Sequence, residues 1–192
     1  MPLLTLEHSP GAYRADFLIY GAATLALGLT LALKHPPGSA GPLALWALAG
    51  AAAWSPLEYL LHRFVLHGVP PFSRWHAEHH QRPTALIGSP TLLSASLFTV
   101  LVALPAWWLL GKWAAAALVF GLIAGYLLYG LTHHATHHAV PKGRPWSGWI
   151  SARKRWHAQH HAAAADGAAR QYFGVTSGVW DHIFGTAGTL RR

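Results

Sequence analysis

The sequence of 192 residues contains no cysteine and few charged residues. Without thiolates the chain can form no disulfide, iron–sulfur cluster or thiolate zinc site, so a bound metal would need histidine or carboxylate ligands. Charged residues make up 10% of the chain, whereas a typical soluble domain has about 25%. Acidic residues are the scarcest, with six against fourteen lysines and arginines. This composition argues against an ordinary soluble domain.

Hydrophobic residues, by contrast, make up 53% of the chain and gather in four long runs. Each run approaches the roughly 20 residues that an α-helix needs to cross a bilayer. They predict membrane-spanning helices at about 17–33, 42–61, 89–110 and 113–132. The turns after the first and third runs are too short to hold a domain. The spans therefore pair as two hairpins with both turns on one side.

The lysines and arginines orient these hairpins. Only Lys34 and Lys112 lie on the side of the two turns, and the other twelve of the fourteen lie on the opposite side. By the positive-inside rule, the opposite side faces the cytoplasm. We therefore predict an all-α integral membrane protein whose residues 1–192 form one domain, in what we expect to be the bacterial inner membrane. Segments 62–88 and 133–192 would form a helical cap on its cytoplasmic side.

Histidine is the residue in excess, and twelve of the fifteen copies fall in four clusters on the predicted cytoplasmic side. The clusters are His62 and His67; His76, His79 and His80; His133, His134, His137 and His138; and His157, His160 and His161. Positions i, i+3 and i+4 share a helix face, so RWHAEHH (74–80) and RWHAQHH (155–161) each present three imidazoles in one direction. His62 and His67 differ by about 140° around an α-helix, so they reach one site only if the helix bends or ends between them.

The third cluster contains two alternative pairs at the end of the fourth predicted span. His133 and His137 are four residues apart, as are His134 and His138, and only one pair can point inward. Tyr129 lies one turn earlier on the His133 face. We therefore favour His133 and His137 as ligands and keep His134 and His138 as the alternative.

So many converging imidazoles would repel one another when protonated and would leave ring nitrogens unpaired when neutral. A metal cation that collects them removes both costs. A single zinc ion takes three or four protein ligands, so about ten histidines predict two metal ions. The predicted ligands are His62, His67, His76, His79, His80, His133, His137, His157, His160 and His161. An all-nitrogen set suits zinc, copper, nickel or iron.

Five stretches of sequence follow one another along the chain. They are LEYLLHRFVLH (57–67), HAEHH (76–80), YGLTHHATH (129–137), RWHAQHH (155–161) and YFGVTSGVWDHIFGT (172–186). Four histidine boxes in this order, followed by this tail, resemble the fatty acid hydroxylase and sterol desaturase superfamily of membrane di-iron oxygenases. One departure is Gly130, where that superfamily commonly has an aspartate after the tyrosine.

The resemblance implies a centre of two iron ions, which zinc can replace during purification, with O2 as co-substrate. It implies O2-dependent hydroxylation of an unactivated C–H bond in a lipid, most simply a fatty acid or acyl lipid. Electrons would come from a separate donor, such as a ferredoxin or a cytochrome b5-like protein with its reductase. The other partners would be the lipid substrate and the bilayer. No nucleic acid is expected, because the basic residues suit anionic headgroups better.

Four residues outside the histidine clusters are candidates for supporting a ligand or lining the substrate path. They are Glu58, Tyr129, Trp180 and Asp181. Glu58 lies one turn before His62, where it either orients a histidine N–H or stands as a helix-end carboxylate at the membrane interface.

Three other functions stay open at this point. A carotenoid-ring hydroxylase of the β-carotene type and a sterol or isoprenoid oxidase are the enzymatic alternatives. A metal-binding or metal-transport membrane protein is the non-enzymatic one, and it would line a path across the membrane with histidine. No histidine lies deep inside a predicted span, which favours a catalytic site at the membrane surface.

Overall fold

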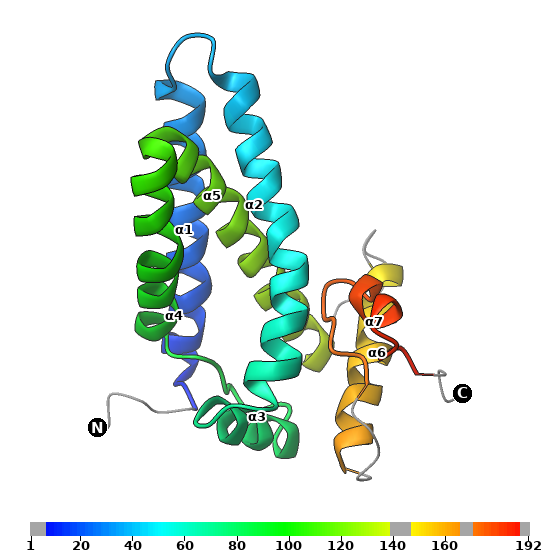
Figure 1. Cartoon of the computed structure of the whole chain (residues 1–192). Helices are drawn as coiled ribbons and strands as arrows, with labels where there is room; N and C mark the ends of the chain where they lie inside the picture. The colour runs from blue at the N-terminus through cyan, green and yellow to red at the C-terminus, as the bar shows by residue number, and fades with distance from the viewer. Residues whose placement is uncertain (1–6, 139–146, 166–170, 189–192) are drawn as a thin grey trace. The chain divides into compact units, whose positions relative to one another are not determined.

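The computed structural model describes residues 7–138, 147–165 and 171–188. Within these ranges the fold is all-α and contains no strand (Figure 1). The helices are α1 (Pro10–Lys34), α2 (Ala40–Leu60), η1 (Leu61–Leu66), α3 (Phe72–Gln81), α4 (Thr91–Phe98), η2 (Thr99–Ala103), α5 (Leu104–His137), α6 (Ser147–Ala165) and α7 (Val179–Ile183), of which η1 and η2 are π-helical.

The chain divides into two compact units. The first, which we call the bundle unit, contains the chain up to Trp54 together with Leu86–Leu127. The second, which we call the histidine unit, contains Ser55–Ala85 together with the chain from Leu128 onward. The sequence predicted one domain over the whole chain, and that assignment stays a prediction.

Capping residues bound α1. The Ser9 Oγ accepts a hydrogen bond from the Ala12 N–H at 3.2 Å, and Pro10 occupies the first turn, where its missing N–H costs nothing. Lys34 lies in the last turn, where its charge meets the carbonyl end of the helix. The helix therefore extends beyond the predicted span of 17–33, mainly at its N-terminal end.

The helices of the bundle unit approach one another closely at glycines. A Cβ atom at Gly121 would lie 1.9 Å from the carbonyl oxygen of Ala47, and one at Gly50 would lie 2.1 Å from that of Leu118. Any side chain there would push α2 and α5 apart. Small residues at such contacts are typical of helices in membranes, where close van der Waals packing holds the helices together.

One aromatic cluster joins four helices of the bundle unit. Tyr126 of α5 lies 4.7 Å from Tyr20 of α1, 5.3 Å from Trp54 of α2 and 5.2 Å from Phe98 of α4, measured between ring centroids. The Tyr20 hydroxyl is also 2.7 Å from the Ser94 Oγ in a buried hydrogen bond. Edge-to-face contacts of this kind stabilise the packing beyond the area that the rings bury.

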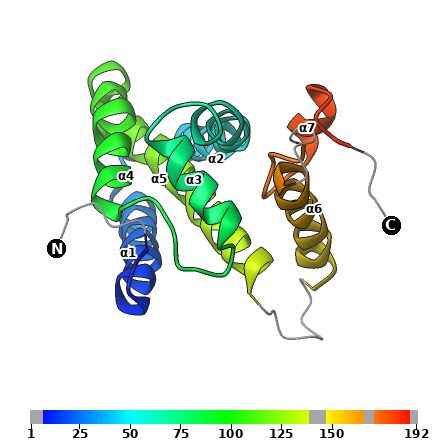
Figure 2. The same cartoon turned by 90° about the horizontal axis from the view of Figure 1, so that it is seen from below.

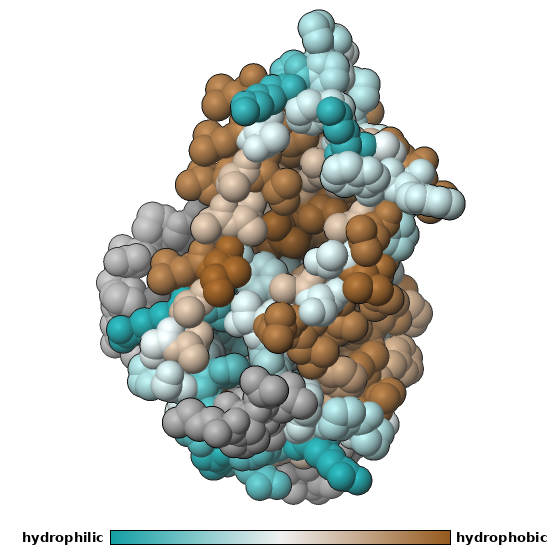
Figure 3. All heavy atoms as spheres, turned by 90° about the vertical axis from the view of Figure 1, so that its left-hand side faces the viewer, coloured by the Kyte–Doolittle hydropathy of each residue, from teal (hydrophilic) through white to brown (hydrophobic). Residues whose placement is uncertain are grey.

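Two stretches are long and apolar enough to cross a membrane, Pro10–Lys34 and Thr91–His137. Their surfaces are apolar too, since Leu33, Leu92 and Trp108 are 76, 79 and 88% exposed. Figure 3 shows apolar side chains, in brown, over much of the displayed face. Exposed apolar surface of this extent marks contact with lipid or with another protein. The count of four spans and the cytoplasmic side remain predictions.

The second stretch contains the predicted fourth span and all but the first two residues of the predicted third span. Within it α5 is interrupted at Gly111, whose φ of 77° and ψ of 166° are not helical. Glycine takes a positive φ at little steric cost, and Gly111 belongs to the turn predicted between those spans. In Figure 1 the chain runs in opposite directions through α4 and the later part of α5.

The histidine unit contains the last residues of α2, η1, α3, the end of α5, α6 and α7. α6 and α7 lie side by side in both ribbon views (Figures 1 and 2), and the rings of Trp156 on α6 and His182 on α7 are 5.6 Å apart. Residues 171–178, which precede α7, belong to the same unit.

Candidate metal centre

The ten histidines predicted as ligands lie together in the histidine unit. Nine of them form two groups, in each of which one ring nitrogen per residue lies within 4.8 Å of the others. Group one is His62, His67, His76, His80 and His160. Group two is His79, His133, His137 and His157. The tenth, His161, contacts both groups, because its Nε2 is 3.1 Å from that of His157 and its ring stacks 4.1 Å from that of His80.

The two heptapeptides each contribute to both groups. α3 supplies His76 and His80 to group one and His79 to group two. α6 supplies His160 to group one and His157 to group two. The three imidazoles on one helix face therefore reach two adjacent sites, which is why the same heptapeptide pattern occurs twice.

The π-helix η1 brings His62 and His67 to the same side of the chain, although they are five residues apart. Hydrogen bonds in a π-helix join residues i and i+5, so side chains five apart come to the same face. The two imidazole rings accordingly stack 5.2 Å apart with an interplanar angle of 26°. Both belong to group one. The departure from an α-helix that the five-residue spacing predicted is thus the wider turn of a π-helix.

Of the two alternative histidine pairs in the third cluster, the pair on the Tyr129 face lies with the other histidines. His133 and His137 belong to group two, and the Tyr129 ring stacks on His133 at 5.8 Å. The rings of His134 and His138 stack on each other at 4.3 Å, and neither belongs to a group among the described residues. The favoured pair is therefore the one that the structure brings to the other histidines.

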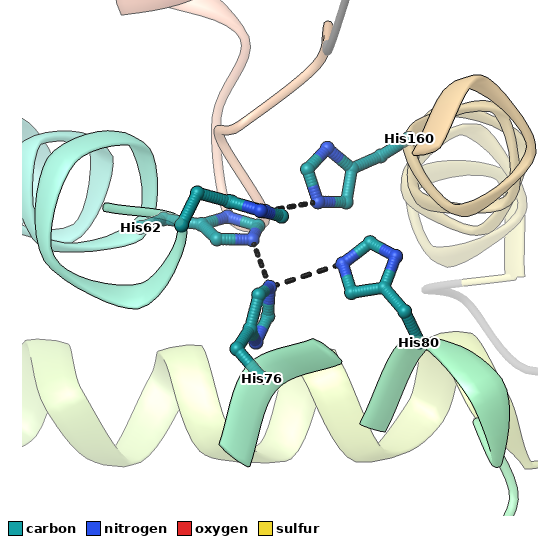
Figure 4. Close-up of side chains that lie close together, drawn as sticks. His62, His76, His80 and His160 are labelled. Atoms are coloured by element: carbon teal, nitrogen blue, oxygen red, sulfur yellow. Dashed lines mark hydrogen bonds between the residues drawn. The ribbon is translucent and has the colours of Figure 1, made fainter. Parts of the chain in front are cut away.

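The ring nitrogens of group one converge on one point. Figure 4 shows His62, His76, His80 and His160 pointing toward one another from η1, α3 and α6. The Nε2 atom of His76 is 2.9 Å from that of His62 and 3.1 Å from that of His80. Two nitrogens bound at right angles to one metal, each at about 2.1 Å, would be about 3 Å apart. The spacing therefore fits a shared metal ion.

Protons alone do not satisfy these nitrogens. The His62 Nδ1 is 2.5 Å from the carbonyl oxygen of Phe173, to which it donates, so the Nε2 of a neutral His62 carries a lone pair. The His76 Nε2 faces two other Nε2 atoms and has one proton at most to donate. In group two, both ring nitrogens of His79 are buried and have no hydrogen-bond partner in the described part of the chain. Buried lone pairs without donors are costly unless a cation binds them.

Burial keeps the histidines in the form that binds metals. The pKa of His79 is lowered to about 4, mainly because burial disfavours the charged ring and secondly because of His161. Burial also lowers the pKa of His157 and His160 well below the ordinary value. Neutral imidazole is the metal ligand, so no proton has to leave these rings at neutral pH.

Glu58 is buried within the protein, with 3% of its surface exposed. Its Oε1 accepts hydrogen bonds from the backbone N–H groups of Val175 at 2.6 Å and Thr176 at 2.8 Å. Its Oε2 accepts a further bond from the Thr176 hydroxyl at 2.5 Å. These bonds hold the C-terminal segment, and a role of Glu58 in orienting an imidazole stays a prediction.

Trp180 and Asp181 play different parts at α7. The fully buried Asp181 accepts hydrogen bonds from the N–H groups of Phe173 and Gly174, both at 2.8 Å, and from the Thr186 hydroxyl at 2.7 Å. The Trp180 Nε1 donates to the Ser55 Oγ at 3.0 Å and so attaches α7 to α2. A role of either residue in lining the substrate path stays a prediction.

The family model for fatty acid hydroxylase matches residues 47–186, which include all ten histidines and both buried carboxylates. The chain belongs to the fatty acid hydroxylase family. A solved structure of full-length scs7p, in which only the hydroxylase domain is visible, shares the fold with a TM-score of 0.71 at 21% identity. The match covers 100% of this chain and 70% of that one.

Sequence relatives of this fatty acid hydroxylase family member include three hydroxylases. Dihydroceramide fatty acyl 2-hydroxylase FAH2 of Arabidopsis thaliana is 33% identical over 71% of this chain and 58% of its own length. Fatty acid 2-hydroxylase of Homo sapiens is 30% identical over 72% of this chain and 38% of its own length. Ceramide very long chain fatty acid hydroxylase scs7 of Schizosaccharomyces pombe is 30% identical over 74% of this chain and 42% of its own length. The chain therefore spans less than two thirds of each relative.

Sequence reasoning missed the backbone groups that contact the imidazoles of this family member. The carbonyl oxygens of Gln171 and Phe173 accept hydrogen bonds from His160 and His62. No residue type marks such carbonyls, since every residue has one. The available signal was the tail motif itself, whose residues FGVT (173–176) contain the four amides that bind Glu58 and Asp181.

Proposed function

We propose that this protein is a membrane-bound, O2-dependent hydroxylase of fatty acyl chains with a His-ligated di-iron centre. The observation that carries the proposal is the pair of histidine groups, whose buried ring nitrogens face one another without enough protons to satisfy them. The names of the relatives, which are 2-hydroxylases of fatty acids or dihydroceramide acyl chains, support carbon 2 of an acyl chain as the position that reacts.

Group one would hold one iron ion and group two the other, with His161 beside both. With iron bound, the centre would supply the activation of O2 that hydroxylation of a C–H bond requires. The overall reaction consumes the C–H bond, O2, two electrons and two protons, and it yields the alcohol and water. A ferredoxin or a cytochrome b5-like protein with its reductase would supply the electrons.

The residues of this chain contribute a neutral, oxidation-resistant and dry environment. The ten ligands are imidazoles, and the whole sequence contains no thiol that O2 chemistry could oxidise. Burial of His62, His157 and His160 keeps water from their rings. Four membrane spans, with segments 62–88 and 133–192 on the cytoplasmic side as the sequence predicts, would let a lipid reach the site from the bilayer.

The proposal is tested by lipid mass spectrometry. The full chain is expressed with a reductase system in a host that makes abundant acyl lipids, and fatty acids released from the lipids are compared with those of a His79→Ala, His160→Ala double variant. We expect fatty acids with one added oxygen at carbon 2 in the wild type alone. The matched control is His134→Ala, His138→Ala, which removes two histidines outside both groups and should keep the product.

The proposal is wrong if the wild-type protein, shown to contain two iron ions per chain, adds no oxygen to any acyl chain. Feeding β-carotene or a sterol to the same host tests the other substrate classes. Oxygen added to either of these lipids and not to fatty acids would replace the acyl substrate and keep the metal centre. Metal content without any oxidised lipid would favour the metal-binding alternative.

A further inference from the structure

The segment Gln171–Thr176, which we call the strap, contacts group one through its backbone. The Gln171 carbonyl oxygen accepts a hydrogen bond from the His160 Nδ1 at 2.7 Å. The Phe173 carbonyl oxygen accepts one from the His62 Nδ1 at 2.5 Å. Each bond places the ring proton on Nδ1 and leaves the Nε2 lone pair for the metal.

The strap is itself held by two buried carboxylates. Asp181 accepts from the N–H groups of Phe173 and Gly174, and Glu58 accepts from those of Val175 and Thr176. Four consecutive amides thus bind two acids, at distances of 2.6 to 2.8 Å. Hydrogen bonds to an ionised acceptor are about twice as strong as neutral ones, so the backbone position is firmly fixed.

Between the Gln171 and Phe173 carbonyls, which contact histidines, lies a residue with a left-handed backbone conformation. Tyr172 has a φ of 59°, which is uncommon for a non-glycine residue. Its N–H donates to the Thr186 carbonyl at 3.0 Å and its ring packs 4.8 Å from that of Trp156. The surrounding contacts therefore impose a backbone conformation that Tyr172 would not favour alone, as is common beside functional sites.

Among the residues that the structure describes, group two has no counterpart of the strap at two of its members. The Nδ1 atoms of His79 and His157 are buried and have no hydrogen-bond partner among the described residues. The same is true of the His80 Nδ1 in group one, whereas His62 and His160 of group one bind the strap. No hydrogen bond to Nδ1 therefore fixes the orientation or the tautomer of the His79 and His157 rings. The two groups offer similar numbers of imidazoles but differ in how those imidazoles are supported.

We propose that Glu58 and Asp181 are positioning residues that act through the strap to make group one the tighter, preformed metal site, whereas group two takes its final geometry only with the metal. The proposal rests on the proposed two-metal centre. It assigns to the two acids an effect on one site and not on the other. A general structural role would instead weaken both sites together.

The test is a metal titration of the purified full chain in detergent after its metal has been removed by chelation. Co²⁺ is added in the presence of a competing chelator, and bound metal is followed by absorption and by elemental analysis. We expect two binding steps in the wild type. His76→Ala should abolish the tighter step and His133→Ala the weaker step, which assigns the steps to the groups.

Glu58→Gln and Asp181→Asn keep the size of each side chain and remove its charge. We expect each to weaken the tighter step by about 10- to 100-fold, the usual effect of losing a group that orients a ligand, and to leave the weaker step within a factor of about two. Glu78→Gln is the matched control, because Glu78 lies beside the ligands His79 and His80 but pairs with Arg82 at the surface. It should change neither step.

Milder variants keep the test decisive if the acid variants do not fold. Thr176→Val and Thr186→Val each remove one hydroxyl that donates to Glu58 or Asp181. They should weaken the tighter step by a smaller factor in the same direction. Equal weakening of both steps, or no weakening of either, would overturn the positioning role.

The outcome for the wild type separates this inference from the proposed function. Two steps of equal affinity would overturn the asymmetry and leave a two-metal hydroxylase in place. Binding of no metal, or of one ion per chain, would overturn the centre itself.

Discussion

The bundle unit and the histidine unit are stabilised by different kinds of contact. In the bundle unit, α2 and α5 meet backbone to backbone at Gly50 and Gly121, and aromatic rings fill the space beside them. In the histidine unit, ten imidazoles and two buried carboxylates are added to aromatic contacts such as that between Trp156 and Tyr172. The bundle unit is therefore sensitive to added volume, and the histidine unit to changes in proton and metal chemistry.

The largest expected effect separates ligand from non-ligand histidines. Replacing His160 by alanine removes a member of group one, so we expect loss of about one metal ion per chain and loss of hydroxylated product. Replacing His134 by alanine should leave both unchanged. Elemental analysis of the purified variants measures the metal. Equal metal loss in both variants would contradict the division into ligand and non-ligand positions.

The next prediction tests the bundle unit alone. Gly121→Leu places a side chain where even a Cβ would lie 1.9 Å from the Ala47 carbonyl oxygen. We expect the free energy of unfolding in detergent to fall by about 3 kcal/mol or more, the upper range for an overpacked site. Gly21→Leu is the control, since a Cβ at Gly21 meets nothing within 4 Å. Similar stability of the two variants would show that α2 and α5 do not pack this closely.

A third prediction concerns acid and the histidine unit. The pKa of His79 is about 4 in the folded protein, against 6.5 for an unperturbed histidine, because of burial and then of His161. Between these values the unfolded chain binds more protons at this position, so the contribution of His79 lowers the stability of the metal-free protein as pH drops below 6.5 and levels off near pH 4. At pH 5 this histidine alone would cost about 2 kcal/mol.

Unfolding at a series of pH values, with and without His79→Ala, measures this contribution. The variant should show a flatter decline below pH 6.5, whereas His182→Ala, at an exposed position of α7, should follow the wild type. A wild-type curve that stays level from pH 7 to 5 would contradict neutral, buried imidazoles.

The smallest predicted effect again concerns the bundle unit. Tyr20→Phe removes the hydroxyl that lies 2.7 Å from the Ser94 Oγ but keeps the ring contact with Tyr126. The lost hydrogen bond should lower the free energy of unfolding by about 1 kcal/mol and leave the metal content unchanged. A change in metal content would show that the two units depend on each other at this position.

The sequence indicated which histidines lie together in the structure, because residue type and spacing determine which side chains share a helix face. The i, i+3, i+4 pattern identified the faces of α3 and α6, and the Tyr129 face identified His133 and His137 over the alternative pair. The five-residue spacing of His62 and His67 indicated a departure from the α-helix, but its form as a π-helix could not be read from residue type.

The hydrogen bonds that position the ligand histidines could not be predicted in the same way. Glu58 was identified as a residue near the site, yet its partners lie 117 and 118 positions later in the chain. Those partners are backbone amides, which carry no signature in a sequence. Long-range contacts between a side chain and a backbone need the folded chain before they can be recognised.

The long distance in sequence between Glu58 and the strap affects the order in which parts of the protein fold. The strap is synthesised more than a hundred residues after Glu58, so the acids and amides that fix His62 and His160 meet only late in translation. Contacts between such distant parts of a chain also form slowly, because a long loop must close first. Group one, although the more firmly supported of the two, would therefore be among the last parts of the protein to become ready for a metal ion.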